Sequence, residues 1–398
     1  MINLRGKKLL IQGAGRGHLG LIKTAKRNGI YTIVTGMPGN YPCIPLADKI
    51  CYADITDKKR ILQIAREEMV DGILICCSDT GLETVGYICD QLGLKGITEV
   101  AAKMCSDKML MKKALIDNNV RTARFLVINN EMEILTISEK LNYPLILKAT
   151  DLQGSRGIYV VHTEDELIAS YKEVMEQTKQ SYCIVEEFIE GREFGAQAFV
   201  YNGEVIFILP HGDETFMCRT AVPVGHYMPF DVDNTLHEDI ELQARLAIKA
   251  LQLDNCAVNI DFIEKDGKVY IIELTGRAGA NCLPELTGNY WNIDYYEMIL
   301  SAALGGDPKL VFDNRPNYTS ATCAQMIKSA YTGIVKSLSY SNTDSNIAVD
   351  LFISEGSTIR TFTNCNDAIG QIICTGNTLD ECRQKINSLL KNFKIQLC

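Results

Sequence analysis

The first hundred residues alternate short apolar runs with amphipathic segments, and this alternation restricts the fold more than any other feature of the chain. Strands are predicted at Lys8–Gln12, Tyr31–Thr35 and Gly72–Cys76, and the first helix at Leu19–Asn28. Strands that alternate with helices are typical of a parallel sheet covered by helices. The segment therefore predicts an open α/β domain.

A glycine-rich turn follows the first predicted strand and opens the first predicted helix. Gly15, Gly17 and Gly20 fit the spacing G-x-G-x-x-G, in which backbone N–H groups at a helix N-terminus approach a pyrophosphate. The second strand, however, ends in Ile33–Met37, without the acidic residue that holds an adenosine ribose. An NAD-dependent oxidoreductase is therefore the weaker alternative. We interpret the turn as one wall of a substrate cleft, or as tight packing between strand and helix.

Two acidic residues follow the third predicted strand. Asp79 and Glu83 lie beyond its carboxyl end, which is where open α/β sheets bind ligands. They are candidates to bind a substrate amine, and a solvated loop is the alternative for both.

Beyond residue 100 the pattern changes to mixed strands and helices. A helical stretch, Glu99–Asn119, leads into this region, where hairpins are predicted around Asn202-Gly203 and Lys265-Asp266-Gly267. The composition changes again after Gly305-Gly306-Asp307-Pro308. At 398 residues the chain is long for one compact core. We therefore predict three domains, at residues 1–100, 101–305 and 306–398.

Composition and charge exclude several classes of protein. The chain has 40 Lys plus Arg against 49 Asp plus Glu, a net charge of −9, and its basic residues are scattered, so nucleic acid is not an expected partner. No apolar run reaches the roughly 18 residues of a membrane span. The 15 cysteines show no zinc-binding spacing. Because the N-terminus also lacks a signal-peptide pattern, we expect a cytoplasmic location.

A pair of carboxylates on the second predicted hairpin is the strongest candidate site. Asp261 and Glu273 lie twelve residues apart, on the predicted strands Ala257–Glu264 and Lys268–Leu274. Antiparallel pairing brings both carboxylates to one end of a cleft. Oxygen ligands of this kind suit Mg²⁺, which keeps part of its water shell and bridges phosphate oxygens.

Further motifs precede this hairpin in a fixed order. They are Asp107-Lys108, the strand Leu145–Lys148, the glycine loop Asp151–Gly157 and the strand Cys183–Glu187. The loop joins two strands, so it is not a Walker-type phosphate loop. With these motifs in this order, the chain resembles the ATP-grasp superfamily, in particular its carboxylate–amine ligase branch with biotin carboxylase and the purine-biosynthetic ligases. The resemblance implies a Rossmann-like pre-ATP-grasp domain, an ATP-grasp domain and a small C-terminal α+β domain.

The resemblance implies that the phosphates of ATP bind between these motifs. Lys108 and Lys148 would supply positive charge to them. The loop would fold over the β- and γ-phosphates and exclude water from an activated intermediate. The loop residues expected to contribute are Gly154, Ser155, Arg156 and Gly157.

The nucleoside is expected against the strand Cys183–Glu187. By the same resemblance, backbone groups near Glu187 and Ile189 pair with the adenine edge. Glu186 would face the adenine amino group. Glu193 matches the residue that accepts hydrogen bonds from the ribose hydroxyls.

The resemblance also extends the metal site and shows one departure from the family pattern. In the family, Asn stands two positions after the second carboxylate and Arg stands four positions after it. Here Thr275 takes the place of Asn, and Arg277 is kept. The expected ligands of Mg²⁺ or Mn²⁺ are therefore Asp261, Glu273 and Thr275. Arg277 would clamp an acyl phosphate or substrate carboxylate, and Arg219 would add positive charge near the transferred phosphoryl group.

The activity that the resemblance implies has two steps. A carboxylate attacks the γ-phosphate of ATP, and an amine then captures the acyl phosphate. The expected partners are small carboxylates and amines, as for an amino-acid ligase or a phosphoribosylglycinamide-synthetase-like enzyme, and a homodimer is compatible with this activity. A phosphoribosyl substrate would need a basic phosphate site, for which Arg16, Arg219 and Arg277 are the candidates. Because of Thr275, an ATP-binding sensor without turnover stays open as an alternative.

Overall fold

A parallel sheet forms the N-terminal part of the chain. The structure, a computed structural model, describes residues 4–152, 156–217 and 221–398. The N-terminal sheet has the order β3-β2-β1-β4. Its strands are β1 (Lys8–Gln12), β2 (Tyr31–Gly36), β3 (Lys49–Tyr52) and β4 (Gly72–Leu74). The helices of this region are α1 (Leu19–Arg27), α2 (Lys58–Glu68), α3 (Leu82–Leu92), α4 (Glu99–Ser106) and α5 (Lys108–Asp117).

The glycine-rich turn between β1 and α1 is filled by protein side chains. A Cβ atom on Gly20 would lie 2.3 Å from the ring of Tyr296, and one on Gly17 would lie 2.7 Å from Cβ of Cys77. Real Cβ atoms do not approach other atoms so closely, so both positions require glycine for packing. The tight-packing interpretation therefore accounts for two of the three glycines that suggested a dinucleotide site.

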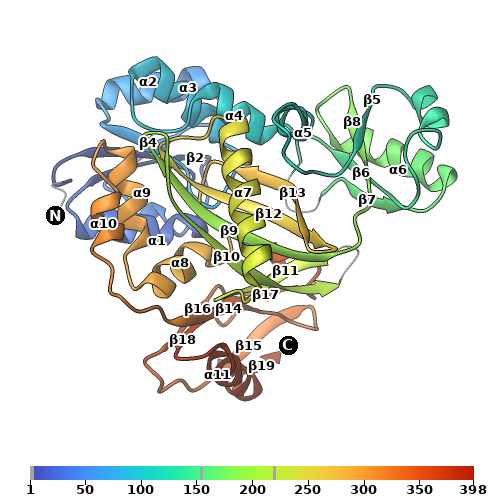
Figure 1. Cartoon of the computed structure of the whole chain (residues 1–398). Helices are drawn as coiled ribbons and strands as arrows, with labels where there is room; N and C mark the ends of the chain where they lie inside the picture. The colour runs from blue at the N-terminus through green and yellow to red at the C-terminus, as the bar shows by residue number, and fades with distance from the viewer. Residues whose placement is uncertain (1–3, 153–155, 218–220) are drawn as a thin grey trace.

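A small antiparallel sheet and one long helix form a separate lobe (Figure 1, green, right). The sheet has the order β5-β8-β6-β7. Its strands are β5 (Phe125–Ile128), β6 (Leu145–Ala149), β7 (Ile158–Val161) and β8 (Cys183–Glu187), and α6 (Glu164–Gln177) packs on it. Buried Leu147, Val185 and Leu167 belong to the hydrophobic core of this lobe. Because β6 and β7 pair antiparallel, the predicted strand–loop–strand around residues 151–157 is confirmed.

The large antiparallel sheet forms the centre of the molecule (Figure 1). Its order is β13-β12-β9-β10-β11-β14-β18-β16. The strands are β9 (Arg192–Tyr201), β10 (Glu204–Met217), β11 (Ala221–Met228), β12 (Cys256–Lys265), β13 (Lys268–Thr275), β14 (Ala321–Ile327), β16 (Ile347–Leu351) and β18 (Gly370–Gly376). The associated helices are α7 (Asn234–Ala250), α8 (Leu283–Trp291), α9 (Tyr295–Ala303) and α10 (Lys309–Asp313).

The large sheet runs through the domain boundary predicted near residue 305. Strands β14, β16 and β18 all follow that boundary, and β14 pairs with β11. A further small sheet and one helix cover this end, formed by β15 (Gly333–Ser339), β17 (Thr358–Ile359), β19 (Lys394–Leu397) and α11 (Leu379–Asn392). The division into three domains remains a prediction, but one sheet joins the second and third. None of the helices in the described ranges is both long and apolar enough to cross a membrane.

Candidate active site

The carboxylate pair lies at the end of the hairpin formed by β12 and β13. The two-residue turn Asp266-Gly267 has φ values of 53° and 72°, as the favoured hairpin turns require. Asp261 pairs directly with Glu273 in the register of these strands. Residues that are directly opposite in an antiparallel pair point to the same face. The hairpin prediction is therefore confirmed, and the two carboxylates are neighbours.

The proximity of the two carboxylates changes their acid–base chemistry. Asp261 is exposed, but the protein around its carboxyl group removes part of the water that would stabilise the charge. This desolvation, together with the negative charges of Glu273 and Asp213, raises the pKa of Asp261 to about 7. Two adjacent carboxylates that repel each other fit a divalent cation such as Mg²⁺, whose charge would offset the repulsion.

Asp261→Asn is expected to stabilise the fold at high pH. In the unfolded chain the carboxyl of Asp261 has its ordinary pKa of 3.8, and in the folded chain its pKa is about 7. The raised pKa therefore destabilises the folded state increasingly as the pH rises from 3.8 to about 7, and by a constant amount above pH 7. Because Asp261 is exposed, solvent screening reduces this effect. The variant should therefore gain about 1–2 kcal/mol in free energy of unfolding at pH 8. Urea unfolding at pH 8 and pH 5 measures it. An equal gain at both pH values would contradict the explanation.

Lys108 connects the carboxylate pair to the glycine loop. Its Nζ lies 3.2 Å from Oε2 of Glu273 and donates to the carbonyl oxygen of Leu152 at 2.9 Å. Asp107 caps the same helix, accepting from the N–H of Met109 at 2.8 Å. Burial lowers the pKa of Lys108, but Glu273 more than reverses this effect, so the amine stays protonated. A positive charge is thus fixed where the loop and the hairpin meet.

A second, buried charge cluster surrounds Glu186 near the end of β8. Its Oε2 accepts from Nζ of Lys148 at 3.1 Å and lies 3.0 Å from Nζ of Lys112. Glu186, Lys148 and Lys112 are 3%, 6% and 1% exposed. The other carboxylate oxygen of Glu186, Oε1, is buried and has no hydrogen-bond partner among the described residues. An unpaired buried acceptor is costly, so Oε1 fits a ligand N–H such as the amino group of adenine.

Sequence reasoning missed Lys112. It lies four positions after Lys108, so both lysines are on one face of α5, and this helical spacing was the available signal. Lys112 donates to Oγ1 of Thr122 at 2.7 Å, and Thr122 in turn donates to the carbonyl oxygen of Ile271 at 2.8 Å. The lysine therefore connects Glu186 to β13. Burial lowers the pKa of Lys112 to about 8.

Lys112→Met is expected to raise the KM for ATP about tenfold and to change kcat little. The variant removes one of the two cations that orient Glu186, and it does not touch the carboxylate pair. Lys113→Met is the matched control, because Lys113 is adjacent and exposed. Steady-state kinetics with varied ATP measures both variants. Equal KM values for the two variants would show that Lys112 does not position the nucleotide site.

Arg277 and Thr275 both bind Asp79 of the N-terminal region. The Arg277 guanidinium donates through Nε to Oδ1 at 2.7 Å and through Nη2 to Oδ2 at 2.6 Å. The Thr275 hydroxyl donates to the same Oδ1 at 2.8 Å. Burial raises the pKa of Asp79, and Arg277 more than offsets this, so the carboxyl is ionised. Asp79, which the sequence suggested as a site for a substrate amine, is instead the ion-pair partner of Arg277.

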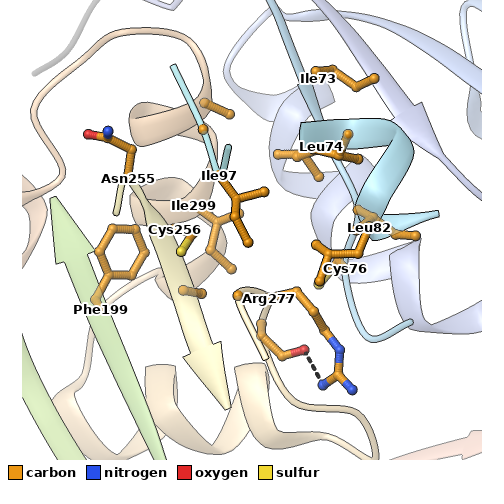
Figure 2. Close-up of a pocket in the computed structure, with 17 residues that line it drawn as sticks. Ile73, Leu74, Cys76, Leu82, Ile97, Phe199, Asn255, Cys256, Arg277 and Ile299 are labelled. Carbon is orange, nitrogen blue, oxygen red and sulfur yellow. Dashed lines mark hydrogen bonds between the residues drawn. The ribbon is translucent and has the colours of Figure 1, made fainter. Parts of the chain in front are cut away.

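A small apolar cavity lies where the N-terminal sheet meets the large sheet (Figure 2). Its volume is about 40 Å³. Figure 2 shows Leu74, Ile97, Phe199 and Ile299 around it and Arg277 at its edge, where Nη1 donates to the carbonyl oxygen of Ala278 at 3.0 Å. The cavity is lined mainly by apolar side chains, so it belongs to the packing behind Arg277 rather than to the charged site around Asp261 and Glu273.

Comparison with known proteins identifies the family. Residues 141–285 match the ATP-grasp domain. The crystal structure of phosphoribosylglycinamide synthetase from Anaerococcus prevotii is 48% identical, with a TM-score of 0.87 over 98% of this chain and 100% of that one. The chain belongs to the ATP-grasp family. The resemblance expected from the ordered motifs, and the α/β plus α+β fold class, are thereby confirmed.

Two curated relatives place this ATP-grasp chain among the carboxylate–amine ligases. D-alanine–D-alanine ligase of Pediococcus pentosaceus is 28% identical over 219 residues, which cover 53% of this chain and 60% of that protein. The chain thus spans less than two thirds of that relative. Formate-dependent phosphoribosylglycinamide formyltransferase of Prochlorococcus marinus is 22% identical, over 99% of both chains. The chain is a ligase of the ADP-forming, carbon–nitrogen class, and neither the oxidoreductase nor the sensor alternative is favoured.

In this ATP-grasp chain, the residues expected around the nucleoside lie at the end of β8 and the start of β9. The backbone N–H of Glu187 donates to the carbonyl oxygen of Arg124 at 3.0 Å, so that group is already bonded. Ile189 is half-buried in the segment that follows β8. Glu193, near the start of β9, is exposed, and partial desolvation of its carboxyl group and the charge of Asp213 raise its pKa.

The glycine loop of the ATP-grasp fold is described only in part. Gly157 has a φ of +63°, and a Cβ atom there would lie 2.9 Å from Cβ of Ala149, so glycine is required. Arg156 is exposed at the edge of the loop. Three of the predicted site residues, Gly154, Ser155 and Arg219, lie outside the described residues. The roles of all these residues toward ATP remain proposals.

Proposed function

We propose that the chain uses ATP and Mg²⁺ to join a small carboxylate to a small amine. The substrate carboxylate attacks the γ-phosphorus, and ADP leaves with the electrons of the broken P–O bond. The amine then attacks the acyl carbon, loses a proton and displaces inorganic phosphate. A bound Mg²⁺ would neutralise phosphate charge during the first transfer.

The observation that carries this proposal is the position of Lys108. It contacts Glu273 of the metal pair and the backbone of the glycine loop at Leu152. The β- and γ-phosphates require a positively charged side chain and a metal ion in one place. In this proposal Lys108 supplies the positive charge, and Glu273 holds the metal ion beside it. The buried cluster around Glu186 supports adenine binding at the far end, because Oε1 needs a donor. In this proposal Lys148, beside Glu186, contacts the phosphates nearest the nucleoside.

Two of the three basic residues suggested for a phosphoribosyl group, Arg16 and Arg277, already have partners among the described residues. Nη1 of Arg16 lies 3.4 Å from Oδ2 of Asp350, and its guanidinium lies 3.9 Å from the ring centre of Phe352. Arg277 is held by Asp79. The phosphate of a phosphoribosyl substrate would have to compete with these contacts. The similarity to phosphoribosylglycinamide synthetase nevertheless makes phosphoribosylamine with glycine the first pair to test.

A panel assay of ADP release tests the proposal. The full chain is incubated with Mg²⁺ and ATP, first with phosphoribosylamine and glycine and then with pairs of amino acids. Substrate-dependent release of ADP, with formation of an amide detected by mass spectrometry, is the expected result. If the chain binds ATP tightly but no substrate pair stimulates ADP release, the ligase proposal is overturned and the sensor alternative is favoured.

A further inference from the structure

Three side chains of the large sheet converge on one point outside the carboxylate pair. Nδ1 of His211 lies 2.9 Å from Oδ1 of Asp213, and Nδ1 of His226 lies 2.6 Å from the same oxygen. The three donor atoms all lie within 4.8 Å of one another. The side chains of His211, Asp213 and His226 are 1%, 17% and 5% exposed. Neither the proposed reaction nor the family comparison assigns this cluster a role.

Strand register places these side chains together. Asp213 of β10 is directly opposite His226 of β11. His211 comes two residues before Asp213 on the same strand, so its side chain points to the same face. The convergence is therefore built into the central strands of the sheet and does not depend on a loop.

The cluster lies on the same face of the sheet as the carboxylate pair. In the register of four neighbouring strands, Glu273 is opposite Asp261, Asp261 is opposite Gly195, and Gly195 is opposite His211. A Cβ atom on Gly195 would lie 2.4 Å from Cε1 of His211, so the imidazole occupies the space that a side chain of β9 would fill. Glycine at this position lets the His211 imidazole lie over β9, on the side of the cluster that faces the carboxylate pair.

The charges of this face favour a cation at the cluster. Asp213 is a largely buried carboxylate, and its ion-pair partners among the described residues are the two histidines. Buried carboxylates are stabilised by cations or by metal coordination. Two imidazole nitrogens and one carboxylate oxygen form a donor set typical of Zn²⁺ and neighbouring transition metals, whereas Mg²⁺ prefers oxygen ligands alone.

We propose that His211, Asp213 and His226 bind a divalent transition-metal ion of the Zn²⁺ class, separate from the Mg²⁺ at Asp261 and Glu273. With three protein ligands, the ion keeps an open coordination position. It lies on the face that carries the carboxylate pair, where an oxygen of the substrate carboxylate can occupy that position. This site goes beyond the proposed ligase reaction, because the ion binds without nucleotide.

Titration with Co²⁺ alone tests the site, since Co²⁺ substitutes for Zn²⁺ and absorbs visible light when nitrogen ligands bind it. The full chain is freed of metal with a chelator and titrated in excess Mg²⁺, which competes for the carboxylate pair. We expect visible absorption that saturates. Asp213→Asn and His226→Gln should each weaken Co²⁺ binding at least about tenfold or abolish the absorption. Absent absorption, or absorption unchanged in both variants, would overturn the proposal.

Two controls separate this site from the ligase chemistry. Asp261→Asn disrupts the carboxylate pair and should leave the Co²⁺ absorption unchanged, while His237→Gln alters an exposed histidine of α7 and should also have no effect. Anomalous scattering at the cobalt edge from soaked crystals of the unmodified chain serves if a variant fails to fold. A peak at the two Nδ1 atoms supports the site. A peak only at Asp261 and Glu273 contradicts it.

Discussion

Glu273→Gln is expected to lower kcat about 10²–10³-fold, the range found when one electrostatic stabiliser of a transition state is removed. Glutamine keeps the size of the side chain but removes the charge that would hold Mg²⁺ beside Asp261 and pair with Lys108 at 3.2 Å. The KM for ATP should change less, because the contacts around Glu186 remain. ADP release at saturating substrate measures the effect.

The control for this variant is Glu176→Gln on α6. Glu176 is exposed in the separate lobe, so the same chemical change there should leave the rate within about twofold of the unmodified enzyme. Thermal unfolding checks that both variants fold. Equal rates for Glu273→Gln and the control would mean that the metal site is elsewhere in the chain.

Asp79→Ala is expected to lower the free energy of unfolding by about 3–5 kcal/mol, because it leaves the buried guanidinium of Arg277 without its partner. Both side chains of this pair are 11% exposed. The pair joins the N-terminal region to the end of β13, so the loss should affect the contact between these two parts. Urea unfolding measures it, with Asp117→Ala at the exposed end of α5 as the control.

A double variant distinguishes the ion pair from simple loss of packing. Replacing both partners, as Asp79→Leu with Arg277→Met, should recover much of the stability, since an apolar pair avoids the uncompensated charge. It should not recover activity if Arg277 also binds a substrate anion. If the double variant is as unstable as Asp79→Ala, then the cost comes from a cavity and not from the unpaired charge.

The elements that could be predicted from the sequence are those with a local signal. The strands β1 and β8 were predicted to the residue, because each contains a short run of buried apolar side chains. The strand β3 was missed. Its residues, Lys49–Tyr52, are exposed or half-buried at the edge of the sheet and show no run of buried apolar side chains.

The carboxylate pair of the candidate site was predicted because both residues lie on one local element. Asp261 and Glu273 share a hairpin, so their spacing in the sequence already places them together. Asp79 and Arg277, in contrast, are 198 positions apart and meet only when the N-terminal region packs against the end of β13. Contacts of this kind depend on how distant segments pack, and no local pattern encodes them.

The pairing of β11 with β14 also limits how this chain can be divided or recombined. Cutting the chain near residue 305 would remove β14, β16 and β18 and uncover the N–H and C=O groups of β11 along one side. An uncovered strand of this kind pairs readily with other chains, so a fragment that stops there should aggregate. Chimaeras with related ligases should therefore be joined in loops outside the large sheet. They should not be joined near residue 305, because strands on both sides of that position belong to the same sheet.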